Sequence, residues 1–248
     1  IMMRHFGVAI TAQNGRVTLQ GGTPITGCGV EIPGDPSAAA FIAAAAVLRA
    51  DSDVTMNRIC INSTRIGFYD VLREMGADIT IAHERVENGE RVADITIRGG
   101  AQISGITVTP ERIPAMVDEI PVLAVIAACA QGTTTLQGLA ELRIKESDRV
   151  ALMAAGLKAC GVEIEINGDD MVIHGQGAPP RGGALIETAL DHRIAMSFLV
   201  LGTVTDEPIT VDDARPIGTS FPDFAKVMNS LGAQIEKPDS PVFADADS

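Results

Sequence analysis

The sequence has few aromatic residues and contains no tryptophan. Only 3% of its 248 residues are aromatic, whereas 46% are hydrophobic and 21% are charged. A chain of this length and hydrophobicity can bury a core, either as one large domain or as two small ones. Because large rings are scarce, Ala, Val, Ile and Leu must fill that core.

Positive charge is also scarce. The chain has 19 Lys and Arg against 32 Asp and Glu, which gives a formal net charge of −13 at pH 7. This balance argues against nonspecific binding to nucleic acid or to anionic membranes, so we expect neither as a partner. An anionic ligand would need Lys and Arg side chains gathered in one place, against the unfavourable field of the whole chain.

Metal-binding patterns and targeting segments are missing as well. The four cysteines form no Cys-x-x-Cys pair and the four histidines show no ligand spacing, so we expect reduced thiols and no metal or cofactor. The Ala-rich run Ala38–Ala46 is too short to span a bilayer, and Arg49 and Asp51 follow it closely. Since no signal peptide is recognisable, we expect a soluble, cytoplasmic protein.

The sequence does contain a repeat, in which three segments follow one plan. Each has an apolar helix, a strand, an amphipathic helix that ends at Gly, and another strand. The apolar helices are expected at Ala38–Leu48, Pro121–Ala130 and Ile194–Val204. The elements that follow them are expected at Asp53–Ile61, Ile66–Met75 and Ala77–Ala82; at Thr133–Leu139, Asp148–Cys160 and Val162–Ile166; and at Ile209–Asp213, Phe221–Leu231 and Ala233–Glu236. The Gly suits a left-handed helix C-cap, and the strands after it alternate apolar and polar residues.

Two of these units end in a further strand, at Asp94–Gly100 and Met171–Gly175. The beginning of the chain shows the same ending without a front half, at Phe6–Ile10 and Arg16–Gly22, and its first residue is Ile1. We therefore expect a C-terminal piece of a longer protein. Repeats of about 70–85 residues exceed the 20–50 of ordinary solenoids. They suit an α+β fold whose subdomains of strands and helices pack around shared buried helices.

The third unit has no room for its closing strand. Pro238 and Pro241 follow Ala233–Glu236, and proline cannot donate to a sheet ladder. Folded proteins usually cover an open sheet edge. We therefore expect the third sheet to receive a strand from another polypeptide, or else to show an unpaired edge.

A charged octet, Leu142–Arg149, carries five charges between two apolar stretches. If the following run Val150–Ala155 is helical, the charges lie at its N-terminal end. On one helix Lys145, Glu146 and Arg149 could share a face. The ordinary alternative is a solvated helix start with an ion pair.

An aspartate also precedes each apolar helix, at Asp35, Asp118 and Asp191. Helix capping alone explains Asp35 and the neighbouring Ser37. The other two positions carry additional polar residues that capping does not require. If the units are symmetric, three helix N-termini point toward one region, where they would favour an anionic ligand.

Five stretches together resemble one family, the 5-enolpyruvylshikimate-3-phosphate (EPSP) synthases, in their glyphosate-insensitive bacterial class. The stretches are Met2–Gly7, Pro33–Ala39, Leu142–Arg149, Leu190–Ser197 and Thr219–Phe224. The resemblance implies an enolpyruvyl transferase-like fold of two domains, each with three βαβαββ units around buried parallel helices. It implies that residues 1–32 end the N-terminal domain, that residues 33–237 form the C-terminal domain, and that residues 238–248 are a loose tail.

The resemblance also implies an activity. The family transfers the enolpyruvyl group of phosphoenolpyruvate to the 5-hydroxyl of shikimate 3-phosphate and releases phosphate. This chemistry needs a base for the hydroxyl and an acid for the phosphoenolpyruvate methylene. Carried over by motif, Asp118 resembles the base that holds the shikimate hydroxyls, and Glu146 resembles the proton-transfer carboxylate.

Four further residues resemble the family's substrate-binding groups. Lys145 matches a contact to shikimate 3-phosphate, and Arg149 and Arg193 match the pair that binds phosphoenolpyruvate. An arginine fork meets a carboxylate or phosphate with two hydrogen bonds. His192 lies beside them and is expected at the same ligand. Thr219 departs from the pattern, because some family members carry a phosphate-contacting Lys there.

Three readings stay open at this point. The first is half of this transferase, which is active only with its N-terminal fragment. The second is the related UDP-N-acetylglucosamine enolpyruvyl transferase, which shares the fold but has its catalytic Cys in a region absent from this chain; the charged octet disfavours it. The third is a folded fragment without activity, since half of the cleft would be missing.

Overall fold

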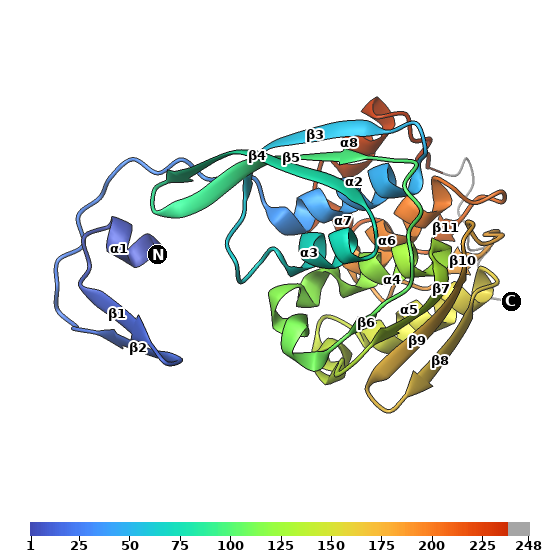
Figure 1. The fold of residues 1–248 in the computed structure, drawn as a ribbon, viewed down its shortest axis with the longest axis horizontal. Coiled ribbons are helices and arrows are strands. Elements are labelled where there is room, and N and C mark those ends of the chain that lie inside the picture. Colours follow the sequence, from blue (N-terminus) through green and yellow to red (C-terminus); the bar gives the residue numbers. More distant parts are fainter. Residues whose placement is uncertain (238–248) are drawn as a thin grey trace, which may run out of the picture.

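The structure is a computed structural model that describes residues 1–237 (Figure 1). The tail expected over residues 238–248 lies outside this range. A short N-terminal segment extends from the body of the molecule and contains α1 (Met2–His5), β1 (Ile10–Gln13) and β2 (Arg16–Leu19). The two strands pair antiparallel, with Ile10 opposite Leu19. Every residue of β2 is exposed, and among residues 1–32 only Val8 is buried.

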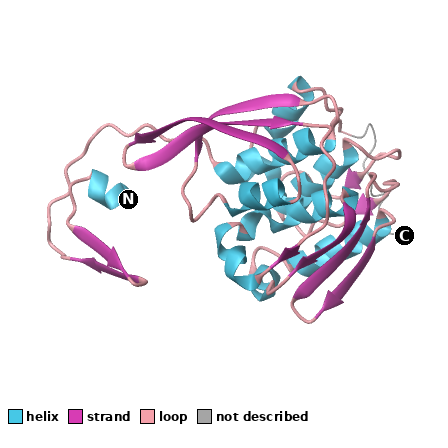
Figure 2. Cartoon of the chain, in the orientation of Figure 1, coloured by secondary structure: helices cyan, strands magenta, loops and turns pink. Residues whose placement is uncertain are grey.

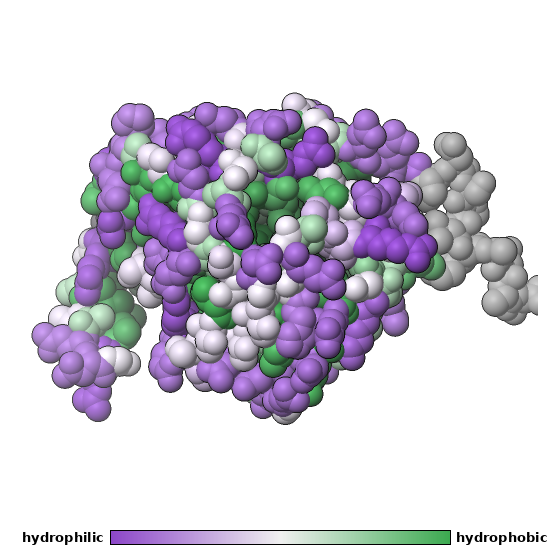
Figure 3. All heavy atoms as spheres, turned by 45° about the vertical axis from the view of Figure 1, so that its right-hand side comes forward, coloured by the Kyte–Doolittle hydropathy of each residue, from purple (hydrophilic) through white to green (hydrophobic). Residues whose placement is uncertain are grey.

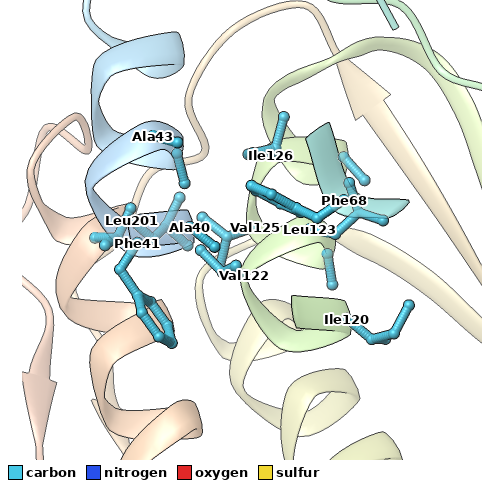
Figure 4. Close-up of a cluster of buried hydrophobic side chains, with 14 of the residues drawn as sticks. Ala40, Phe41, Ala43, Phe68, Ile120, Val122, Leu123, Val125, Ile126 and Leu201 are labelled. Atoms are coloured by element: carbon cyan, nitrogen blue, oxygen red, sulfur yellow. The ribbon is translucent and has the colours of Figure 1, made fainter. Parts of the chain in front are cut away.

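Three buried helices form the centre of the body: α2 (Pro36–Leu48), α4 (Ile120–Cys129) and α6 (His192–Gly202). They are the three apolar helices that the repeat predicts, and each packs on the other two. A helix that is apolar on all sides belongs in a core. In α4 every residue from 120 to 128 is buried. Figure 4 shows side chains of α2 and α4 facing each other, with Leu201 of α6 beside them.

Two sheets and their helices enclose this centre, as Figure 2 shows; their strands pair antiparallel except β6 and β7, which pair parallel. The first unit has β3 (Asp53–Cys60), α3 (Gly67–Glu74), β4 (Asp78–Glu87) and β5 (Glu90–Arg98), in strand order β3-β5-β4. The second has β6 (Thr107–Val108), η1 (Pro110–Ala115), η2 (Val117–Glu119), β7 (Gln131–Leu136), η3 (Ala140–Ile144), α5 (Arg149–Ala159), β8 (Glu163–Asn167) and β9 (Asp170–Gln176), in order β6-β7-β9-β8. The helices that the repeat predicts end as expected, because Gly76 and Gly161 have φ of 104° and 90°.

The third unit differs from the expectation. It has β10 (Leu185–Ile186), β11 (Thr210–Val211), α7 (Ile217–Ser220) and α8 (Phe224–Ser230). The strand expected at Ala233–Glu236 is wrong, since these residues pair with no strand of residues 1–237. Instead, the Ile235 backbone N–H donates to Asn229 Oδ1 at 2.8 Å, and Asn229 Nδ2 donates to the Ile235 carbonyl at 2.9 Å. Within the described residues β10 and β11 pair only with each other. The question of a closing strand also involves residues 238–248, which lie outside the described range, so the open edge stays a prediction.

The cysteines and the helix lengths follow the sequence analysis. All four thiols are free, and burial raises the pKa of Cys129 to about 12 and that of Cys160 to about 11. Over residues 1–237 no helix combines the length and the apolar character that crossing a membrane requires.

Gly156 sets how closely α5 packs on α6. A Cβ atom at this position would lie 2.2 Å from Cζ of Phe198, whose ring is fully buried. We expect Gly156→Ala to destabilise the chain by about 1–3 kcal/mol through overpacking, which outweighs the roughly 1 kcal/mol that alanine gains in a helix. Urea unfolding measures the difference. Gly218→Ala in α7 is the control, because nothing lies within 4 Å of that position. Equal stability of the wild type and Gly156→Ala would contradict the close packing.

Candidate functional site

The buried helices begin close to one another, and an aspartate caps two of them. Asp35 accepts hydrogen bonds from the Ser37 and Ala38 backbone N–H groups at 3.3 and 3.0 Å, at the start of α2. Asp191 accepts from the Arg193 N–H at 2.9 Å, at the start of α6. The start of α4 has no side-chain cap. Capping therefore accounts for Asp35 and partly for Asp191, but not for Asp118, which lies in η2.

Arg149 is the centre of the site. Its side chain is fully buried at the first turn of α5, and three carboxylates surround its guanidinium. Nε lies 2.8 Å from Asp191 Oδ2, Nη1 lies 3.2 Å from Asp118 Oδ1, and Nη2 lies 2.5 Å from Glu146 Oε2. The planar fork of arginine can meet several oxygens at once. One side chain thereby joins η2, the charged octet and the start of α6.

Arg193 approaches the same aspartate from the other side. Its Nη2 lies 3.4 Å from Asp118 Oδ2, and its Nη1 donates to the Asp118 backbone carbonyl at 3.4 Å. The Arg193 side chain is 14% exposed, whereas that of Arg149 is not exposed at all. We call the five residues Arg149, Arg193, Asp118, Glu146 and Asp191 the arginine cluster.

Asp191 is a member of this cluster that the motif comparison did not single out as a ligand or catalytic group. Burial acts to raise its pKa, but the Arg149 guanidinium, the Arg193 N–H and the Ser147 hydroxyl outweigh burial and lower it. The Ser147 hydroxyl donates to Asp191 Oδ2 at 2.9 Å. Asp191 is therefore a buried carboxylate that forms an ion pair with Arg149. Its position within the matched stretch Leu190–Ser197, directly before an expected helix, was the signal for it.

Residues 145–148 of the charged octet lie between η3 and α5 and are not helical, so the expected shared helical face is wrong. Asp148 is the N-cap of α5 and accepts from the Ala151 N–H at 2.9 Å, so the helix begins only at Arg149. Glu146 still reaches Arg149, but from the preceding loop. Lys145 pairs with Glu141 at 2.7 Å instead, so its ammonium lies outside the cluster.

His192 and Thr219 are the two remaining positions that the sequence analysis names, and neither belongs to the arginine cluster. His192 is the first residue of α6, and burial, together with the Arg193 charge, lowers its pKa, which favours a neutral imidazole near pH 7. Thr219 is exposed in α7 and its hydroxyl donates to the Pro216 carbonyl at 2.7 Å. Its hydroxyl thus has a partner within its own helix.

Comparison with known proteins gives consistent matches. The family model of EPSP synthase (3-phosphoshikimate 1-carboxyvinyltransferase) matches residues 1–228. The 3-phosphoshikimate 1-carboxyvinyltransferase of Rhodospirillum rubrum is 51% identical over 241 residues, which cover 94% of this chain and 53% of the relative. That of Granulibacter bethesdensis is 50% identical, with 94% and 53% covered. The chain spans about half the length of the curated relatives that it matches.

Solved structures agree with these relatives. EPSP synthase from Acinetobacter baumannii superposes with a TM-score of 0.90 at 40% identity, covering 95% of this chain and 54% of that one. The enolpyruvyl transferase NikO from Streptomyces tendae superposes with a TM-score of 0.66 at 18% identity, covering 93% and 51%, which is a likeness of fold alone. The expected α+β fold class, that of the enolpyruvyl transferases, is thereby confirmed.

Proposed function

The chain belongs to the EPSP synthase family, and we propose that it supplies the C-terminal half of the active site of a 3-phosphoshikimate 1-carboxyvinyltransferase. In this proposal residues 1–32 end an N-terminal domain and residues 33–237 form the C-terminal domain. The complete enzyme transfers the enolpyruvyl group of phosphoenolpyruvate to the 5-hydroxyl of shikimate 3-phosphate and releases phosphate. The free thiols suit the reducing cytoplasm, where we place the enzyme.

The observation that carries this proposal is the pair of arginines on either side of Asp118. Phosphoenolpyruvate carries a carboxylate and a phosphate, and two guanidinium forks can meet both with charge-assisted hydrogen bonds. Arg149 and Arg193 already hold the Asp118 carboxylate at 3.2 and 3.4 Å. In this proposal the same two guanidinium groups bind the anionic substrate beside Asp118. The positive ends of the three nearby helix starts favour negative charge there as well.

Asp118 and Glu146 supply the two proton transfers in this proposal. Asp118 takes the proton of the attacking hydroxyl, since its carboxylate lies between the two arginines that bind the other substrate. Glu146 is half exposed and lies 2.5 Å from Arg149. It can therefore exchange a proton with the methylene carbon of phosphoenolpyruvate that is bound to the arginines. Lys145 is partly exposed and can turn from Glu141 to shikimate 3-phosphate. His192 contributes a neutral imidazole to the same ligand.

The N-terminal segment supports a protein partner for this half. Exposed hydrophobic side chains in this segment are Ile1, Val17, Leu19, Ile25 and Ile32. Figure 3 shows green, hydrophobic areas on the surface of the molecule. A two-stranded hairpin alone is marginally stable in water. Over residues 1–237 no further strand pairs with β10 or β11 either. We infer that the N-terminal fragment of the same enzyme covers both places.

Mixing this chain with its N-terminal fragment is expected to produce turnover that this chain alone lacks, because the missing half carries further anion-binding groups. The measurement is phosphate release from phosphoenolpyruvate and shikimate 3-phosphate. The same mixture with Arg149→Ala is the control for contaminating phosphatase. Full turnover by this chain alone would refute the need for a partner.

The two other readings have their own outcomes in this assay. UDP-N-acetylglucosamine as the preferred acceptor would indicate the related transferase, a possibility that fold alone does not exclude. A mixture that assembles without turnover would indicate an inactive folded fragment. Placement in the glyphosate-insensitive class rests on the motifs, and inhibition of the complete enzyme by low glyphosate concentrations would overturn it.

A further inference from the structure

Glu119 is a buried carboxyl group that the proposed chemistry does not use. Three acidic or basic side chains are at least nine-tenths buried in residues 1–237. Two of them, Arg149 and Asp191, form an ion pair with each other. The third, Glu119, is 4% exposed and has no ion pair among the described residues, and its Oε1 has no hydrogen-bond partner there.

The arginines near Glu119 already serve other carboxylates. Arg193 lies on Asp118, the residue directly before Glu119 in η2. Arg65, ahead of α3, donates to Asp35 Oδ1 at 3.2 Å and to the Ser37 hydroxyl at 2.8 Å, at the start of α2. Glu119 thus lies near the starts of α2, α4 and α6, and among residues 1–237 no Lys or Arg forms an ion pair with it.

An ionised carboxylate in this place is costly. Both of its oxygens can only accept hydrogen bonds, and a buried charge without a partner costs several kcal/mol. Protonation removes the charge and gives one oxygen a hydrogen. The electrostatic surroundings agree: burial raises the pKa of Glu119 and the Asp118 charge adds to it, while the Ser37 hydroxyl and the Arg193 and Arg65 charges only oppose this rise. Burial likewise raises the pKa of Tyr69 in α3, so its phenol also stays uncharged.

We propose that Glu119 is a positioning residue, held as an uncharged carboxylic acid beneath the arginine cluster, whose neutrality keeps Arg193 available for an anionic ligand. The cluster has three carboxylates for two guanidinium groups. A charged Glu119 would be a fourth carboxylate and would compete with the ligand for Arg193. The ligand part of this inference rests on the proposed function, whereas the charge state of Glu119 does not.

The charge state is tested on this chain by urea unfolding of the wild type and Glu119→Gln between pH 4.5 and 9, where 4.5 is the ordinary value of the group. A raised pKa means that the native state keeps a proton which the unfolded state has lost, so wild-type stability falls as pH rises from that value. Glu119→Gln lacks this loss. We therefore expect its urea midpoint to rise relative to the wild type with increasing pH.

Glu207→Gln is a matched control with the opposite sign. Hydrogen bonding to Arg181 lowers the pKa of Glu207. The urea midpoint of the wild type is therefore expected to rise relative to that of Glu207→Gln as pH rises. The effect will be small because the pair is exposed. If Glu119→Gln does not fold, Glu119→Leu removes the same ionisation and gives the same comparison. A midpoint difference that is constant with pH, or one that shrinks, would overturn the uncharged state.

The positioning role is tested in the complete enzyme. We expect KM for phosphoenolpyruvate to rise with pH more steeply in the wild type than in Glu119→Gln, severalfold at the alkaline end, because only the wild type gains a competing charge. Identical pH profiles of KM would overturn the role. Lack of turnover in the wild-type mixture would refute the proposed function instead, while the unfolding comparison would still decide the charge state.

Discussion

Arg149→Ala is expected to destabilise the folded chain by about 3–5 kcal/mol, because breaking a buried ion pair leaves an uncompensated charge. Asp191 is fully buried and would lose the guanidinium that lies 2.8 Å from it. Asp118 and Glu146 would also lose a partner, although both are partly exposed and can be hydrated. Urea unfolding at neutral pH measures the effect. The loss should shrink in acid, where Asp191 becomes protonated.

Arg193→Ala is the comparison that separates stability from binding. Arg193 is partly exposed and makes longer contacts of 3.4 Å, so its loss should cost much less stability. In the complete enzyme, however, either change should weaken phosphoenolpyruvate binding about tenfold or more, since a charge-assisted hydrogen bond is worth roughly 1.5–3 kcal/mol. Shikimate 3-phosphate binding should change less. Phosphoenolpyruvate affinity within twofold of wild type would make these arginines structural groups only.

The parts of the fold that the sequence predicts are those with local signals. The helices α2 and α4 are apolar on all sides and α6 is largely apolar after its first turn, which a core position explains. Glycine after an amphipathic helix gives its end, because φ is positive there. The strand expected at Ala233–Glu236 failed for the opposite reason. Its residues alternate correctly, but a strand also needs a partner, and alternation says nothing about whether one is present.

The site was predictable as a set of residues but not as a set of contacts. Motifs pointed to Asp118, Glu146, Arg149 and Arg193, and the structure brings all four together. Spacing suggested a helical face for the octet, whereas the Asp148 cap excludes it. Arg149 meets Asp118 across 31 positions and Asp191 across 42, distances in sequence that no periodicity reveals. The buried state of Glu119 likewise depends on chain segments far apart.

Asp118→Asn is expected to lower turnover of the complete enzyme by roughly 10²-fold or more, because asparagine keeps the shape but cannot take a proton. The amide also turns an NH₂ group toward one of the two arginines, where the carboxylate now accepts from both. Glu146→Gln should cause a loss of similar size by the same argument. Phosphate release measures both, and circular dichroism checks that the variants fold.

Helix capping makes the opposite prediction for this variant, since asparagine caps as well as aspartate. Asp118 makes no capping hydrogen bond to α4, so the structure gives no reason for activity to persist. Asp70→Asn is the matched control: this aspartate lies in the first turn of α3, exposed and away from the arginine cluster, and turnover should stay near wild type. If Asp118→Asn retained near-normal turnover as well, Asp118 would be a structural partner of the arginines and the base would have to lie elsewhere.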